Sequence, residues 1–227
     1  MNVAIIAAAG QGTRMRSSRA KQFLELAGTP IIIHTLRAFE LCDAIQEIIL
    51  VLPAQDTAGF LAIAEKHRLK KLSKIVPGGT TRAESVLKGL LAVRSATAQI
   101  IAVHDGVRPL VTPDEITQTV KAAELNDAAI LAAAVTDTIK EVSNGVVAKT
   151  LTRTALRRAL TPQCFRFELL RRAYEQVDVL DPELTDESSL VERLGVQVTI
   201  VEGSSRNIKI TGPEDLALGE VLVKESQ

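Results

Sequence analysis

Short runs of apolar residues alternate along the chain with longer segments whose apolar positions recur at helical spacing. The apolar runs show no polar alternation, so we expect strands that are buried on both faces. The predicted strands are 3–7, 47–52, 74–76, 100–103 and 128–135, and the predicted helices between them are 30–41, 53–67, 81–94 and one that starts after Thr112-Pro113. This order predicts an α/β fold with a Rossmann-like, doubly wound, mostly parallel sheet.

The pattern changes after residue 135. Two extended runs flank Asn144-Gly145, and Asn-Gly is the strongest short signal for a β-hairpin. Because a lone two-stranded ribbon is marginally stable in water, we expect this arm, about 136–153, to pack on something. We favour a second copy of the chain, hence a homodimer, over a ribbon that lies on its own domain. Further on, the pattern predicts helices at 166–176 and 186–194, strands at 196–201 and 207–210, and a last helix from residue 213.

Composition narrows the class of protein. The 227 residues suit one domain, which we place at 1–227 with the hairpin as its extension. Lys plus Arg and Asp plus Glu both number 27, and a balanced charge argues against a nucleic-acid partner. We find no signal-peptide pattern and no apolar run of membrane-spanning length, so we expect a cytoplasmic protein without a membrane partner.

A glycine-rich loop follows the first predicted strand. Gly10 and Gly12 let the backbone approach an anion closely. The dinucleotide-binding pattern needs a third glycine where this chain has Met15, and an acidic residue after the second strand where it has Pro53. Four cations follow the glycines instead: Arg14, Arg16, Arg19 and Lys21. The loop therefore favours triphosphate binding over an NAD site.

Six segments carry a resemblance to known enzymes. They are 7–15 with 21–23, 77–86, 104–109, 160–163, 185–187 and 207–209. Together they resemble the 2-C-methyl-D-erythritol 4-phosphate cytidylyltransferases of the non-mevalonate isoprenoid pathway. The resemblance implies transfer of CMP from CTP to that polyol phosphate, release of pyrophosphate, and use of Mg²⁺ or another divalent cation. Ribitol-5-phosphate cytidylyltransferases share most of these segments, so residue spacing alone leaves both polyol phosphates open.

The resemblance also implies roles for single residues. Arg14 and Lys21 match the pair that stabilises the transition state, and Arg153 and Lys209 match the pair that positions the attacking phosphate. The implied CTP contacts are Ala8, Ala9, Gly10, Gly12, Gly79, Thr80, Ser85 and Asp105. The implied polyol-phosphate contacts are Asp105, Arg108, Thr138, Arg153, Thr161 and Lys209. In the family the arm of one subunit reaches the active site of the other, so Thr138 and Arg153 would act in trans.

Several of these positions have a second interpretation. Thr81 and Glu84 have capping-box spacing, so their segment also begins a helix. Asp105 suits a ribose hydroxyl, the polyol or Mg²⁺, and we assign no protein ligand to the metal. We expect His104 to be a structural hydrogen-bonding residue.

The chain departs from the family pattern at two places. Some relatives carry an acid where this chain has Thr80, and the usual two alanines after Asp105 are replaced by Gly106-Val107. A catalytically inactive nucleotide-binding regulator is the rival interpretation from another class. Such a protein should have lost at least one of the four residues matched to catalysis, and this chain retains all four.

Overall fold

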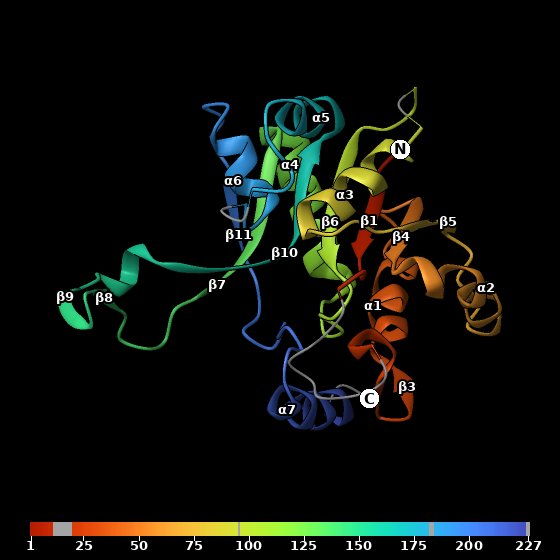
Figure 1. Cartoon of the computed structure of the whole chain (residues 1–227), viewed down its shortest axis with the longest axis horizontal. Helices are drawn as coiled ribbons and strands as arrows, with labels where there is room; N and C mark the ends of the chain where they lie inside the picture. The colour runs from red at the N-terminus through yellow and green to blue at the C-terminus, as the bar shows by residue number, and fades with distance from the viewer. Residues whose placement is uncertain (11–19, 95, 182–183, 226–227) are drawn as a thin grey trace.

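The computed structural model describes residues 1–227 except 11–19, 95, 182–183 and 226–227 (Figure 1). Its centre is a seven-stranded sheet in the order β11-β7-β10-β6-β1-β4-β5. The strands are β11 (Thr199–Glu202), β7 (Ala128–Ala134), β10 (Arg157–Arg166), β6 (Ile100–Asp105), β1 (Val3–Ala7), β4 (Glu47–Leu52) and β5 (Leu72–Pro77). β10 runs antiparallel to both of its neighbours, and the other pairs are parallel.

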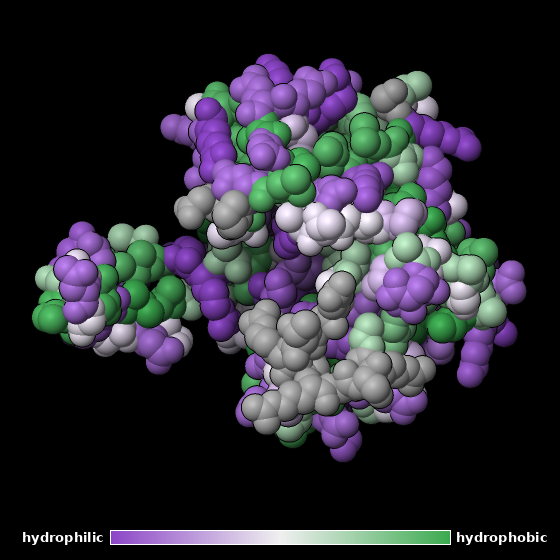
Figure 2. All heavy atoms as spheres, viewed as in Figure 1, coloured by the Kyte–Doolittle hydropathy of each residue, from purple (hydrophilic) through white to green (hydrophobic). Residues whose placement is uncertain are grey.

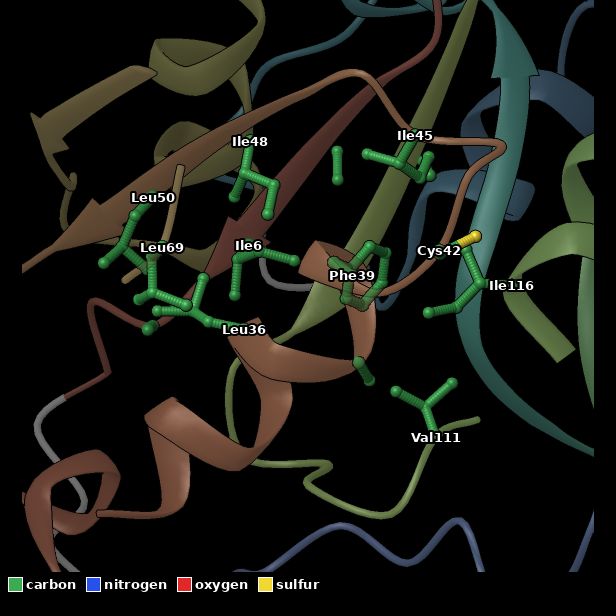
Figure 3. Close-up of a cluster of buried hydrophobic side chains, with 14 of the residues drawn as sticks. Ile6, Leu36, Phe39, Cys42, Ile45, Ile48, Leu50, Leu69, Val111 and Ile116 are labelled. Atoms are coloured by element: carbon green, nitrogen blue, oxygen red, sulfur yellow. The ribbon is translucent and has the colours of Figure 1, made fainter. Parts of the chain in front are cut away.

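Helices cover both faces of this sheet. One face packs on α1 (Ile31–Glu40), α2 (Thr57–Lys66) and α4 (Pro113–Asn126), where Ile6, Leu36 and Phe39 belong to one apolar cluster (Figure 3). The other face packs on α3 (Arg82–Leu91), α5 (Phe167–Glu175) and α6 (Glu187–Glu192). The α/β, doubly wound and mostly parallel fold expected from the sequence is therefore confirmed.

Two predictions about local structure fail. The segment 157–166 is a ten-residue strand, β10, that the sequence pattern did not reveal because Pro162 interrupts its apolar run. The predicted strand at 207–210 is wrong, because the described residues of this segment pair with no strand. Asn207 and Ile208 donate only to nearby carbonyls, those of Ser204 and Arg206, and Ile210 donates to the carbonyl of Val107 (2.9 Å). The chain then enters α7 (Pro213–Lys224), as expected.

Short elements fill the connections of the described chain. A strand pair, β2 (Glu25–Leu26) and β3 (Thr29–Pro30), precedes α1. Single 3₁₀ turns are η2 (Lys21–Phe23), η3 (Ala54–Asp56) and η4 (Arg153–Ala155). None of the helices in the described part of the chain combines the length and the apolar character that a membrane crossing requires.

The hairpin arm is present as predicted. β8 (Lys140–Ser143) and β9 (Val146–Thr150) are joined by Asn144 and Gly145, whose φ angles of 50° and 77° suit a two-residue turn of type I′. The arm projects from the body, and every residue of both strands is exposed (Figures 1 and 2). The ribbon therefore does not lie on its own domain.

Candidate active site

A pocket of about 480 Å³ opens at the carboxyl ends of the central strands β1 and β6. Open α/β sheets bind their ligands at this edge, where the chain leaves the strands. The described residues that line the pocket are Ala7, Ala8, Ala9, Gly10, Lys21, Gln22, Gly79, Thr80, Thr81, Arg82, Ser85, Asp105, Val107 and Lys209. Segments far apart in the sequence thus meet at one site.

The first wall is the end of β1 and the residues that follow it. Ala8, Ala9 and Gly10 line the pocket as expected, and the backbone N–H of Ala8 is bonded to the carbonyl of Val51 (2.9 Å). Lys21, on η2, returns to the same pocket. Two predicted site residues of this loop, Gly12 and Arg14, lie outside the described residues, as do Arg16 and Arg19, which match no family residue and are expected to be surface charges.

The second wall is the turn between β5 and α3. A Cβ on Gly78 would lie 2.2 Å from the Cβ of Ala9, so only glycine lets this turn approach the end of β1. Ser85 accepts a hydrogen bond from the N–H of Gly79 (3.0 Å) and donates one to the carbonyl of Thr81 (2.8 Å). Gly79 and Ser85 therefore both line the pocket, and the serine hydroxyl fixes the shape of the turn.

A carboxylate lies beside Thr80. The backbone N–H and the hydroxyl of Thr80 donate to Oε2 of Glu84 at 2.6 and 2.9 Å, and these bonds lower the pKa of Glu84 to about 2. The hydroxyl of Thr81 accepts from the N–H of Glu84 (3.0 Å), so Thr81 caps α3 as its spacing predicted. Although the chain has no acid at position 80, Glu84 thus supplies a negative charge next to it.

Asp105 is the electrostatic centre of the pocket. It ends β6, is buried, and faces three cations. Its Oδ1 accepts from Nε of Arg82 (3.1 Å), and its Oδ2 contacts Nζ of Lys209 (2.9 Å) and Nε of Arg108 (3.3 Å). Burial by itself would raise the pKa of Asp105, but Arg82, then Lys209 and Arg108, hold it well below its ordinary value. Because its oxygens already face cations of the chain, Asp105 is poorly suited to bind Mg²⁺.

His104 has the structural role expected of it. It is fully buried and packs on the ring of Phe39, with 4.9 Å between ring centroids. Its Nε2 lies 3.2 Å from the carbonyl of Arg108 and its Nδ1 lies 2.9 Å from the hydroxyl of Thr161. A carbonyl only accepts, so Nε2 carries the proton and Nδ1 accepts from Thr161. Burial lowers the pKa of His104 to about 3, so the ring is neutral.

Four residues predicted to bind the polyol phosphate do not line the pocket. Thr161 lies behind Asp105, and its hydroxyl accepts from the N–H of that residue (3.2 Å). Arg108 contacts Asp105 from the side and donates to the carbonyl of Asn207 (2.9 Å). Thr138 and Arg153 are exposed at the base of the arm, where Arg153 donates to the carbonyl of Thr136 (2.7 Å).

The pocket also contains residues that sequence reasoning left without a role. They are Ala7, Gln22, Arg82 and Val107, whereas Thr81 was expected only to cap a helix. Gln22 is buried, and its Nε2 has no hydrogen-bond partner in the described part of the chain. Position gave a signal for two of them, since Gln22 follows Lys21 directly and Arg82 lies within the segment 77–86.

The change from Ala-Ala to Gly106-Val107 has a packing reason. A Cβ on Gly106 would lie 2.6 Å from the Cβ of Ala8 and 2.9 Å from Cδ1 of Ile32. Val107 belongs to an apolar cluster with Leu26 and other residues near α7, and it also lines the pocket. In this chain glycine is therefore required at 106. Val107 contributes both to the pocket lining and to the apolar cluster that contains Leu26.

Comparison with known proteins agrees with this geometry. Residues 2–225 match the sequence model of a family described as 2-C-methyl-D-erythritol 4-phosphate cytidylyltransferase. Two curated enzymes of that name, from Pelotomaculum thermopropionicum and Geobacter metallireducens, are each 43% identical to the chain over 226 residues. The alignments cover 99% and 98% of this chain and 94% and 97% of those proteins. The chain belongs to this family.

A solved structure supports the family at the level of the fold. The 4-diphosphocytidyl-2C-methyl-D-erythritol synthase from Anaerococcus prevotii superposes with a TM-score of 0.86 at 32% identity. The superposition covers 98% of this chain and 96% of that one. As a member of the cytidylyltransferase family, the chain is an enzyme of the nucleotidyltransferase class.

Proposed function

We infer that this cytidylyltransferase transfers CMP from CTP to 2-C-methyl-D-erythritol 4-phosphate, in the non-mevalonate isoprenoid pathway. The products are 4-diphosphocytidyl-2-C-methyl-D-erythritol and pyrophosphate. The observation that carries this inference is the match to the family over nearly the whole chain, residues 2–225 in sequence and 98% of the chain in structure. The family model and the relatives named above favour the methylerythritol substrate over the ribitol 5-phosphate alternative.

The pocket suits an in-line phosphoryl transfer. A phosphate oxygen of the polyol phosphate forms a bond to the α-phosphorus of CTP, while the bond from that phosphorus to the bridging oxygen of pyrophosphate breaks. The attacking phosphate is already an anion near neutral pH, so no activating base is needed. Positioning and charge stabilisation therefore carry the catalysis.

We assign these tasks to the residues matched from the family. Lys21, which lines the pocket, and Arg14, which lies outside the described residues, are proposed to stabilise charge on the α-phosphate and the leaving group. Lys209, which also lines the pocket, is proposed to position the attacking phosphate. The cytosine is proposed to lie against Gly79, Thr80 and Ser85, where the turn backbone can limit the space to a pyrimidine.

We propose that the arm completes the site of a second subunit. Three apolar side chains on the arm, Val142, Val146 and Val147, are exposed to solvent. Burial of such side chains against a partner is favourable, at roughly 25 cal/mol per Å² of apolar surface. Thr138 and Arg153, at the base of the arm, would then reach the partner's pocket. On this proposal a monomer lacks part of the site for the attacking phosphate.

We also propose that a divalent cation, Mg²⁺ by preference, accompanies the triphosphate. The described residues contain no group of three or more His, Cys, Asp or Glu side chains able to hold a metal ion. Mg²⁺ commonly keeps several waters and binds phosphate oxygens, so it does not need a dedicated protein cage. The cation would neutralise charge on the triphosphate while the side chains of the pocket orient it.

Pyrophosphate release tests the proposed function. The enzyme is assayed with CTP and Mg²⁺, in parallel with 2-C-methyl-D-erythritol 4-phosphate and with ribitol 5-phosphate. We expect release with the first alone. Release with ribitol 5-phosphate would instead support the ribitol-5-phosphate cytidylyltransferase reaction, and no release with either would contradict the proposal.

The single-domain organisation and the cytoplasmic location remain predictions. Limited proteolysis tests the first, and cell fractionation tests the second.

A further inference from the structure

Lys209 forms an ion pair with Asp105, and its proposed role with the substrate phosphate requires that this ion pair break. Its Nζ lies 2.9 Å from Oδ2 of Asp105, whereas the proposed function needs this ammonium on the phosphate of the polyol phosphate. When the lysine turns to that phosphate, Asp105 loses one of its three cations. Some other group must then keep the carboxylate in place.

Arg82 is built for this task. Its Nε donates to Oδ1 of Asp105 (3.1 Å), the oxygen that neither Lys209 nor Arg108 contacts. Its Nη1 donates to both carboxylate oxygens of Glu187, at 2.7 and 2.9 Å. The planar guanidinium thus bridges two carboxylates, one in the pocket and one behind it. A lysine ammonium is a point charge and cannot make this pair of directed contacts.

Glu187 is a fixed anchor for the guanidinium. Only 1% of its side chain is exposed, compared with 27% for Arg82. Its Oε1 also accepts from the hydroxyl of Tyr174 (3.1 Å), and its backbone N–H donates to Oε1 of Gln163 (3.1 Å). Its position is therefore set by contacts with β10 and α5 and by its place at the start of α6.

We propose that Arg82, anchored by Glu187, is a positioning residue that holds Oδ1 of Asp105 while Lys209 leaves Oδ2 for the substrate phosphate. Oδ2 is then turned toward the pocket and accepts a hydrogen bond from a hydroxyl of the polyol phosphate. Arg108 stays beside that oxygen, fixed by its bond to the carbonyl of Asn207. This inference rests on the proposed function and adds a residue pair that the family assignment leaves without a role.

The test compares the effect of each variant on KM for the two substrates. Steady-state kinetics are measured for wild type, Arg82→Gln, Arg82→Lys and Glu187→Gln, with either CTP or 2-C-methyl-D-erythritol 4-phosphate varied. We expect Arg82→Gln and Glu187→Gln to raise KM for the polyol phosphate at least tenfold and to change KM for CTP less than threefold. Arg82→Lys should fall between them and wild type.

Arg171→Gln is the matched control. Arg171 also bridges two carboxylates, Glu168 and Glu175, but on the exposed side of α5. Its replacement should leave both KM values within twofold of wild type. Circular dichroism and thermal melting establish that each variant is folded, and Glu187→Gln or Arg82→Lys serves if Arg82→Gln does not fold.

A double-variant cycle provides a readout that a merely structural role would not move. Because Arg82 acts through Asp105, adding Arg82→Gln to Asp105→Asn should raise KM for the polyol phosphate less than threefold further. A full tenfold effect in that background, an equal rise in both KM values, or unchanged kinetics in folded variants would each overturn the proposal. Failure of wild type to turn over either polyol phosphate would instead contradict the proposed function.

Discussion

The pocket and the arm both contain ion pairs, but these pairs lie in opposite environments. At the pocket, Nη1 of Arg82 lies 2.7 Å from Oε1 of Glu187, which stands behind the pocket and is almost entirely buried. On the arm, Lys149 and Glu141 are 3.0 Å apart, with 63% and 52% of their side chains exposed. Water screens the second pair and competes for its hydrogen bonds, whereas the first pair depends on its partners within the protein.

This difference separates two ways of making a functional element. The shape of the arm comes from the turn at Asn144-Gly145 and from the pairing of β8 with β9. The residues of both strands are exposed to solvent. The pocket is assembled from distant segments whose charges hold one another in place before substrate arrives. We therefore expect substitutions in the pocket to act within one subunit, and substitutions at the base of the arm to act on the partner.

The largest effect is expected at Lys21. Lys21→Ala should lower kcat by about 10²- to 10³-fold, the usual loss when one group that stabilises developing charge is removed. Binding of CTP, measured by calorimetry, should remain detectable. Lys121→Ala is the control, because Lys121 is an exposed lysine on α4 that does not line the pocket. Near-normal turnover of Lys21→Ala would contradict the proposed catalytic role of this residue.

Subunit mixing tests whether the arm acts in trans. Lys21→Ala and Arg153→Ala should each be nearly inactive alone. After the two are mixed and allowed to exchange, half of the dimers carry one intact site, so about a quarter of wild-type activity should return. Absence of recovery, with exchange verified by mass spectrometry of tagged subunits, would place Arg153 in its own subunit's site or outside the mechanism.

The two ion pairs should differ in their contribution to stability. Glu187→Gln should lower the free energy of unfolding by about 3 kcal/mol, because it leaves a guanidinium partly uncompensated in a buried site. Glu141→Gln should lower it by less than about 0.5 kcal/mol, as expected for an exposed pair. Urea denaturation measures both. Equal effects would mean that the environments of the two pairs are not as different as their exposure indicates.

The buried imidazole should make the body of the enzyme sensitive to moderate acid. The pKa of His104 is about 3 in the folded chain against 6.5 when exposed, so the unfolded state binds the extra proton as pH falls below 6.5. The free energy of unfolding should therefore drop by about 2 kcal/mol between pH 7.5 and pH 5. Asp105 adds its own loss only below its ordinary value of 3.8.

His104→Gln is the variant that isolates this effect, because an amide keeps a donor and an acceptor but does not titrate. His34 and His67 also have lowered pKa values, mainly through burial, so they contribute a smaller loss of the same sign. Urea unfolding at the two pH values should show a shallower dependence in His104→Gln than in wild type. An unchanged dependence would assign the acid sensitivity to other groups.

The amino-acid sequence by itself determined the elements whose signals are local. Buried strands such as β1 and β6 appear as unbroken apolar runs, the α3 cap follows from the spacing of Thr81 and Glu84, and the arm follows from Asn144-Gly145. Each of these depends on neighbours within a few residues. The motifs near Lys21 and Asp105 likewise identified residues of one pocket, because residues after parallel strands meet at one edge of the sheet.

Only the tertiary structure decided what depends on distant partners. β10 is a strand because β6 and β7 pair with it on either side, although Pro162 lies within it. The guanidinium of Arg82 is held by Asp105 and Glu187, which are 23 and 105 residues away in the sequence. Only folding brings both carboxylates to it. Charges separated by so many residues interact strongly only after the sheet forms and excludes water from between them. No local sequence pattern therefore predicts these ion pairs.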